Sequence, residues 1–245
     1  MKILYQIPGN VSGGPLGGGE LERRRSLLQA WAAAGTEVAV ADTPGGPLSI
    51  ESHAEEALCV PPMIDAIARR QPPPDAVIVG CFGDPGLAAL RELLDVPVVG
   101  PLEASFHLAA QLGARVGIVT VLDSVIPLLD GLVRSMGQTL RYAGAVAIDL
   151  PVLDVTRRAA DAAGRLVEAG GTLLRQRHAD VLVLGCMSLA FLDLAPRVSH
   201  ELGVPVVNPA KVALKTAEVL VTQGLLQSRR TYPKPRKGLP TASGT

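Results

Sequence analysis

Short apolar runs alternate with longer amphipathic stretches along the chain, and the same alternation occurs in both halves. The runs are rich in Val and Ile, which is typical of buried parallel strands joined by helices. The first half predicts strands at 2–7, 37–41, 76–79 and 96–99, with helices at 20–34 and 54–70 and a short helix before the last strand. The second half predicts strands at 115–120, 145–149, 181–184 and 204–207, with helices at 124–136 and 156–176.

One motif occurs twice at corresponding places. Residues 75–86 read DAVIVGCFGDPG and residues 180–191 read DVLVLGCMSLAF, so each copy has an acid, an apolar strand and a Gly-Cys pair in one order. The next strand is bracketed by prolines in both halves, as VPVVGP at 96–101 and VPVVNP at 204–209. Chance similarity between Val-rich strands explains one such pair, but not the whole ordered set. The sequence therefore predicts an internal duplication.

The predicted fold class is α/β, with two similar lobes that are each a short parallel sheet flanked by helices. We expect a pseudo-twofold relation between the lobes, with the active-site cleft between them. The predicted parts are a first lobe at 1–100 plus 210–230, a second lobe at 101–209 and a mobile tail at 231–245. Residues 102–113 are expected to cross between the lobes, and the amphipathic helix 210–227 to pack back on the first.

The charge balance and the cysteine count limit the function. The 245 residues include 23 acidic and 23 basic side chains, so no electrostatic footprint suggests a nucleic-acid or membrane partner. We therefore expect a small-molecule ligand. The N-terminus lacks the long apolar stretch of a signal peptide, and three cysteines are an odd number for a disulfide framework. These features predict a cytoplasmic protein with reduced thiols.

Cys81 and Cys186 are the candidate catalytic residues. Both follow a buried strand and a glycine, at the carboxyl end of the sheet where ligands of open parallel sheets bind. We expect each to lie near the start of a helix, which lowers a thiol pKa from about 8.5 toward neutrality. Two thiols facing one another across a cleft can take a proton from a carbon acid on one side and return it on the other. That is the geometry of a two-base racemase or epimerase. Cys59 has helical spacing and is predicted to be a core residue.

Three stretches resemble a known family: CFGDPGL at 81–87, PVVGPLEASFHLAAQLGARVGIVT at 97–120 and LGC at 184–186. They are similar to the aspartate/glutamate/hydantoin racemase superfamily, and most of all to the hydantoin racemases, a branch that includes allantoin racemases. The resemblance implies a two-lobed fold and cofactor-independent racemisation of a carbon acid such as a 5-substituted hydantoin. It also implies that Cys81 and Cys186 are the acid/base pair and that the protein is a homo-oligomer. No cofactor and no metal are expected.

The resemblance further implies a set of substrate-binding residues. The carbonyl or imide groups of the substrate would be held by the backbone amides of Phe82, Gly83, Gly185 and Met187, together with Thr120. Pro8 and Asn10 belong to the turn after the first strand, where the family's Asn-Pro-Asn-Thr-like pattern is only partly kept. Ser188 stands where hydantoin racemases have smaller residues, and we expect it to reshape the pocket wall.

Several side chains near these motifs have open roles. Asp84 either orients a substrate group or caps a turn, and Glu103 either lies at the cleft or favours a helix start. His107 lies on the linking helix, and the four histidines share no metal-ligand spacing. The glycine-rich loop 9–20 lacks a phosphate-binding spacing and is predicted to be a flexible lid.

Two other functions stay open at this point. A decarboxylase or cis-trans isomerase of the same superfamily would use one cysteine to donate a proton or as a nucleophile. A non-catalytic, two-lobed small-molecule binding protein would share the architecture. The presence of two matched cysteines favours the racemase.

Overall fold

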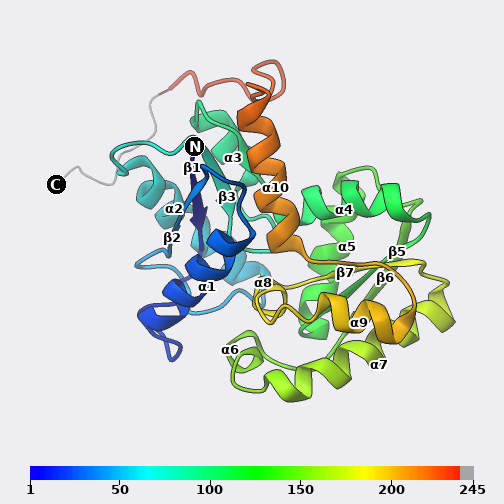
Figure 1. Ribbon diagram of the computed structural model, residues 1–245. Coiled ribbons are helices and arrows are strands. Elements are labelled where there is room, and N and C mark those ends of the chain that lie inside the picture. The colour runs from blue at the N-terminus through cyan, green and yellow to red at the C-terminus, as the bar shows by residue number, and fades with distance from the viewer. Residues whose placement is uncertain (238–245) are drawn as a thin grey trace.

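The computed structural model describes residues 1–237 and contains two parallel four-stranded sheets (Figure 1). The first has the order β2-β1-β3-β4, from β1 (Lys2–Gln6), β2 (Glu37–Ala41), β3 (Ala76–Val79) and β4 (Val98–Val99). The second has the order β6-β5-β7-β8, from β5 (Val116–Thr120), β6 (Tyr142–Ala147), β7 (Val181–Leu184) and β8 (Val206–Val207). The strand order is therefore the same in both sheets, and the predicted α/β fold of two similar lobes is confirmed.

Helices flank each sheet, as the sequence predicts. The first lobe has α1 (Gly18–Trp31), α2 (His53–Ala68) and α3 (Leu87–Leu93). The second has the 3-10 turn η1 (Asp123–Val125) and the helices α5 (Ile126–Ser135), α6 (Val152–Val155), α7 (Ala159–Arg177), α8 (Met187–Ala190) and α9 (Ala195–Leu202). Two more helices are α4 (Pro101–Leu112) and α10 (Pro209–Thr222). Among residues 1–237, no helix is long and apolar enough to cross a membrane.

Several elements differ in their limits from the prediction; the last helix, for example, is expected to reach residue 227 and ends at Thr222. The strand expected at 145–149 begins at Tyr142, because a register irregularity opposite Val116 and Gly117 lets Tyr142 pair with Val116. Gly144 lies there at φ 107°, a backbone conformation that glycine adopts without steric cost. The helix expected at 156–176 is divided into α6 and α7, since Arg158 leaves the helical region at ψ 35°.

Apolar side chains fill the space around both sheets. The inner strands β1, β3, β5 and β7 are buried almost throughout, which explains their continuous runs of Val, Ile and Leu. One large cluster of buried side chains extends from the first lobe into the second. A smaller cluster, built around Leu4, Met63 and Leu90, lies between the first sheet and the helices α2 and α3.

The helices α4 and α10 pack against each other between the lobes (Figure 1). α4 contacts β5 and β7, whereas α10 contacts α1, β3 and β4, so the last helix packs against elements of the first lobe. Asn208 fixes the start of α10, because its Oδ1 accepts hydrogen bonds from the N–H groups of Ala210 and Lys211. Its Nδ2 donates to the carbonyl of Ala190, which ties α10 to the end of α8.

The segment after α10 lies against the end of α3. Gln227 Nε2 donates to three backbone carbonyls of this region, those of Arg91, Leu94 and Val96. Arg91 Nη1 donates to the Tyr232 hydroxyl at 3.2 Å. The predicted mobile tail at 231–245 lies in part outside the described residues, and its mobility stays a prediction.

Phe191, just after α8, packs against side chains of the first lobe. Its ring is stacked on Trp31 at 6.0 Å and meets the ring of Tyr5 edge-on at 5.6 Å. The guanidinium of Arg24 lies 5.0 Å from the centre of the same ring. The side chain is almost completely buried, so this aromatic contact helps to hold the two lobes together close to both Gly-Cys turns.

Candidate active site

The two Gly-Cys turns occupy equivalent places in the two lobes. Cys81 follows the last residue of β3 by two positions, and Cys186 follows the last residue of β7 by two. In each turn the glycine N–H donates to a carbonyl of the neighbouring inner strand at 2.7 Å, from Gly80 to Gln6 and from Gly185 to Val119. The repeated sequence motif therefore places one thiol at the equivalent position in each lobe.

Both turns require glycine because the neighbouring strand lies too close for a side chain. A Cβ at position 80 would lie 2.7 Å from Tyr5 Cε1 and 2.9 Å from the Gln6 carbonyl oxygen. A Cβ at position 185 would lie 2.6 Å from Ile118 Cγ2. Any other residue would push the following cysteine away from the strand end.

The repeated acids at the start of each motif fix the strand register. Asp75 accepts a hydrogen bond from the N–H of Lys2. Asp180 accepts from the N–H groups of Ala114 and Arg115 at 2.9 and 2.8 Å. Each acid therefore links the start of its own strand to the start of the neighbouring inner strand. The Gly-Cys turn lies at the opposite end of the same two strands.

Both thiols line one cavity, which we call the thiol cavity and whose volume is about 80 Å³. The first lobe contributes Ile7, Pro8, Gly9, Val11, Leu16, Arg24, Leu48, Ser49, Ile50, Gly80, Cys81 and Phe82. The second lobe contributes Val121, Val152, Leu153, Cys186, Met187 and Ser188. The lining is mainly apolar, and Arg24 is its single charged side chain among the described residues.

Six of the ten predicted site residues line the thiol cavity: Pro8, Cys81, Phe82, Cys186, Met187 and Ser188. Asn10 holds a turn instead, since its Oδ1 accepts from the N–H of Gly13. The hydroxyl of Thr120 donates to the carbonyl of Gly185 at 3.2 Å. The N–H of Gly185 donates to the carbonyl of Val119 at 2.7 Å, and the substrate-binding role expected for this amide stays a prediction.

Gly83, the remaining predicted residue, lies outside the lining, and its N–H points to the Cys81 thiol. Cys59 is fully buried in α2, as predicted for a core residue. Part of the predicted lid contributes to the cavity, through Gly9, Val11 and Leu16. Its flexibility stays a prediction.

The protein raises the pKa of both thiols, contrary to the sequence expectation. Burial raises the pKa of Cys186, and the N–H groups of Leu189 and Ser188 together with Arg24 offset this only in part. Burial also raises the pKa of Cys81, and the N–H of Gly83, which lowers this pKa, offsets the effect only in part. The expected lowering rested on helix starts, but α8 is only four residues long and no helix follows Cys81 before Leu87. Desolvation of a buried thiolate therefore outweighs the local dipoles.

Arg24 and Glu20 are site residues that the sequence prediction missed. Both side chains are only 4% exposed, and Arg24 Nε donates to Glu20 Oε1 at 2.7 Å. Arg24 Nη2 donates to the Ser188 hydroxyl at 3.1 Å, across the lobe boundary. The sequence did contain a pattern that indicates this: Glu20, Arg24 and Leu28 are four residues apart, which places all three on the buried face of α1.

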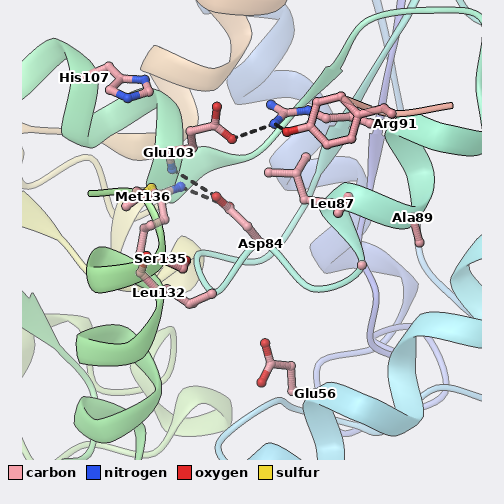
Figure 2. A pocket seen from close by; sticks show the side chains of 14 residues that line it. Glu56, Asp84, Leu87, Ala89, Arg91, Glu103, His107, Leu132, Ser135 and Met136 are labelled. Carbon is pink, nitrogen blue, oxygen red and sulfur yellow. Dashed lines mark hydrogen bonds and ion pairs between the residues drawn. The ribbon is translucent and has the colours of Figure 1, made fainter. Parts of the chain in front are cut away.

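A larger cavity of about 630 Å³ contains neither of the two catalytic candidates (Figure 2). It is lined by the side chains whose roles the sequence left open, Asp84, Glu103 and His107, together with Arg91 and Tyr232. The wall of this cavity contains an ion pair, in which Arg91 Nη1 donates to Glu103 Oε2 at 2.8 Å. We take the thiol cavity as the candidate active site, because both paired cysteines line it.

Asp84 joins the Cys81 turn to the start of α4. Figure 2 shows its carboxylate directed at the helix, where it accepts hydrogen bonds from the N–H groups of Leu102 and Glu103 at 3.0 and 2.9 Å. The carboxyl is buried, and burial raises its pKa to about 7. Asp84 is therefore a helix cap rather than a residue of the thiol cavity. Among residues 1–237, no group of three or more His, Cys, Asp or Glu side chains is arranged to hold a metal ion.

Two equivalent lobes that each place one thiol on a shared cavity define a class of parallel α/β proteins with a paired-cysteine site. The family model for Asp/Glu/Hydantoin racemase matches residues 22–217. The chain belongs to this family, which confirms the resemblance noted in its sequence.

Individual relatives give the same result. The hydantoin racemase of Paenarthrobacter aurescens is 37% identical over 206 residues, which are 83% of this chain and 86% of that protein. The crystal structure of allantoin racemase from Pseudomonas fluorescens has a TM-score of 0.90 and 31% identity, covering 98% of this chain and 99% of that one. Allantoin racemase from Klebsiella pneumoniae has a TM-score of 0.86 and 33% identity, covering 97% and 94%. The protein is therefore an isomerase of the racemase type.

The close approach at Gly185 predicts a loss of stability on adding a methyl group. Gly185→Ala is expected to lower the free energy of unfolding by about 1–3 kcal/mol, because the new Cβ overlaps Ile118. Gly164→Ala is the matched control, since Gly164 lies in α7 and a Cβ added there would meet no atom within 4 Å. This control is expected to gain about 0.5–1 kcal/mol from helix propensity. Urea unfolding measures both, and a gain in both variants would contradict the packing argument.

The raised pKa of Asp84 predicts a pH dependence of stability. The pKa rises from 3.8 to about 7 on folding, so the folded protein binds more protons than the unfolded chain between these values. The free energy of unfolding is therefore expected to fall as the pH rises through this window, relative to Asp84→Asn. Urea unfolding at a series of pH values measures the difference. Parallel curves for the two proteins would show that Asp84 does not titrate in this way.

Proposed function

We propose that the protein racemises 5-substituted hydantoins by proton transfer between the substrate and two thiols, those of Cys81 and Cys186. The single observation that carries the proposal is that both cysteines line one cavity from equivalent positions in two lobes. A carbon held between the thiols can be approached from opposite faces, which is what inversion requires. Membership of the racemase family supports the same reaction type.

The proposed reaction needs one thiolate and one thiol at the start. The thiolate takes the proton from C5 of the ring, and the electron pair of the C–H bond moves onto the adjacent carbonyl to give an enolate. The opposite thiol then donates its proton to the other face of C5, and the carbonyl reforms. The two cysteines have exchanged protonation states at that point, and proton exchange with water restores the starting state.

The lining of the thiol cavity favours a substrate with an apolar substituent. Leu16, Leu48, Ile50, Val152 and Leu153 form much of its wall, and a polar side chain there would lose hydrogen bonds to water without replacement. The polar lining groups, Arg24, Ser49 and Ser188, suit the carbonyl and imide groups of the ring. We therefore infer a 5-alkyl- or 5-arylmethyl-hydantoin rather than allantoin, whose ureido substituent is polar.

A substrate panel tests this preference. Enantiopure 5-benzyl- and 5-isobutylhydantoin are expected to racemise with kcat/KM at least about tenfold above that for allantoin, because the apolar wall stabilises only the apolar substituents. Free aspartate and glutamate serve as further comparisons. Polarimetry and chiral chromatography measure the rates. Preferred turnover of allantoin would contradict the inferred substituent, and no turnover of any hydantoin would contradict the proposed reaction.

Single substitutions test the two-thiol mechanism. Cys81→Ser and Cys186→Ser are each expected to lower the racemisation rate by about 10²–10⁴-fold, the usual contribution of a general acid or base. Each variant is expected to keep solvent-deuterium exchange at C5 for one enantiomer only, and of opposite hand, because one thiol remains on one face. Proton NMR in deuterium oxide measures the exchange.

The matched control is Cys59→Ala, since Cys59 is buried in α2 and outside the thiol cavity. This variant is expected to racemise at the rate of the parent protein. If either single serine variant at the cavity also kept the parent rate, the two-thiol mechanism would be wrong.

A further inference from the structure

The start of α1 carries a buried charge cluster formed by Glu20, Arg23 and Arg24. Glu20 accepts two hydrogen bonds from Arg23, both at 2.8 Å, and one from Arg24 at 2.7 Å. The side chains of Glu20 and Arg24 are each only 4% exposed, while that of Arg23 is 34% exposed. One carboxylate therefore serves two guanidinium groups in a largely buried place.

The charges of this cluster do not cancel. Two arginines and one carboxylate leave one positive charge, and the position of Arg24 places it at the wall of the thiol cavity. A buried charge without full compensation is costly and is stabilised by a nearby charge of opposite sign. The cavity wall has no acidic side chain among the described residues, so the available anion is a thiolate.

The two thiols differ in their relation to this charge. Arg24 favours the charged form of Cys186, and it is held toward that turn by its hydrogen bond to Ser188. The carboxyl of Asp84 lies near Cys81 and opposes a negative charge there. The protein environment is therefore asymmetric, although the two turns are equivalent in backbone position.

We propose that Arg24 makes Cys186, rather than Cys81, the thiol that supplies the thiolate for proton transfer. The proposal rests on the proposed function in assigning these thiols as base and acid. The other titratable groups that interact with Cys186 are Tyr5 and Cys81, while Glu20 is paired with Arg24. The Tyr5 hydroxyl is buried without a hydrogen-bond partner among the described residues, and burial raises its pKa, so it stays neutral.

A preferred direction of the first turnover follows from this assignment. With Cys186 as the thiolate, the protein takes the proton from the enantiomer whose C5–H bond faces Cys186, and it donates the proton of Cys81 to the opposite face. The other enantiomer requires the reverse protonation state, which forms after proton exchange with water. Arg24 itself exchanges no proton and acts through Cys186.

Thiol labelling tests the proposal without any substrate. Iodoacetamide reacts with the thiolate form, and peptide mass analysis gives separate labelling rates for Cys186 and Cys81 in one sample. The ratio of the two rates is expected to fall about tenfold or more in Arg24→Met, because an adjacent opposite charge changes a pKa by about one unit or more. Arg24→Lys keeps the charge and is expected to restore most of the ratio.

A second variant separates charge from structure. Glu20→Gln removes the negative charge of the cluster, so the ratio is expected to rise, opposite to Arg24→Met. A loss of packing alone would change the ratio in the same direction in both variants. Arg25→Met is the control on the same helix, because the Arg25–Glu22 pair is exposed and is not part of the cavity wall, and its ratio is expected to equal that of the parent.

An unchanged ratio in folded Arg24→Met and Glu20→Gln would overturn the proposal, even if Arg24→Met raised KM by losing a substrate contact. Changes of opposite sign would support it. These outcomes are distinct from failure of the proposed function, since a protein that racemises no hydantoin still reports the protonation state of Cys186 through labelling.

Discussion

The candidate active site depends on one hydrogen bond that is made twice. In each lobe a glycine N–H donates to a carbonyl of the neighbouring inner strand, and the residue after that glycine is the cysteine. The bond is short enough to exclude any side chain at the glycine, so the position of the sulfur follows from the packing of two backbones. Sites built on strand ends in this way keep their geometry better than sites on long loops.

In the proposed reaction, burial of the site gives both the selectivity for the substituent and the main chemical difficulty. An apolar cavity excludes water from a reactive carbon and distinguishes substituents, but it also disfavours the thiolate that a proton transfer needs. The charge cluster on α1 addresses this conflict with a fixed positive group instead of a helix dipole. Geometric symmetry between the lobes is therefore combined with electrostatic asymmetry, and in the proposed mechanism this asymmetry decides which of two similar thiols supplies the thiolate.

The sequence predicted the fold and the cysteine pair because both leave local patterns. Strands such as 76–79 and 181–184 are continuous apolar runs, and the Gly-Cys pair follows each at the same distance. The run ELERRRS at 20–26 is strongly polar and is typical of an exposed helix face, so the burial of Arg24 depends on how the second lobe covers α1. The Gly185 amide and the thiol pKa also depend on contacts distant in sequence, which no local pattern records.

The placement of α10 has a consequence for how the chain reaches its native state during synthesis. This helix covers part of the first sheet with Ala213, Leu214 and Ala217, yet it is the last helix of the described residues to leave the ribosome. The first lobe consequently keeps an uncovered apolar surface until the second lobe has been made. Folding of the first lobe is thus completed only after the second lobe has been synthesised. Until then its exposed apolar surface favours aggregation.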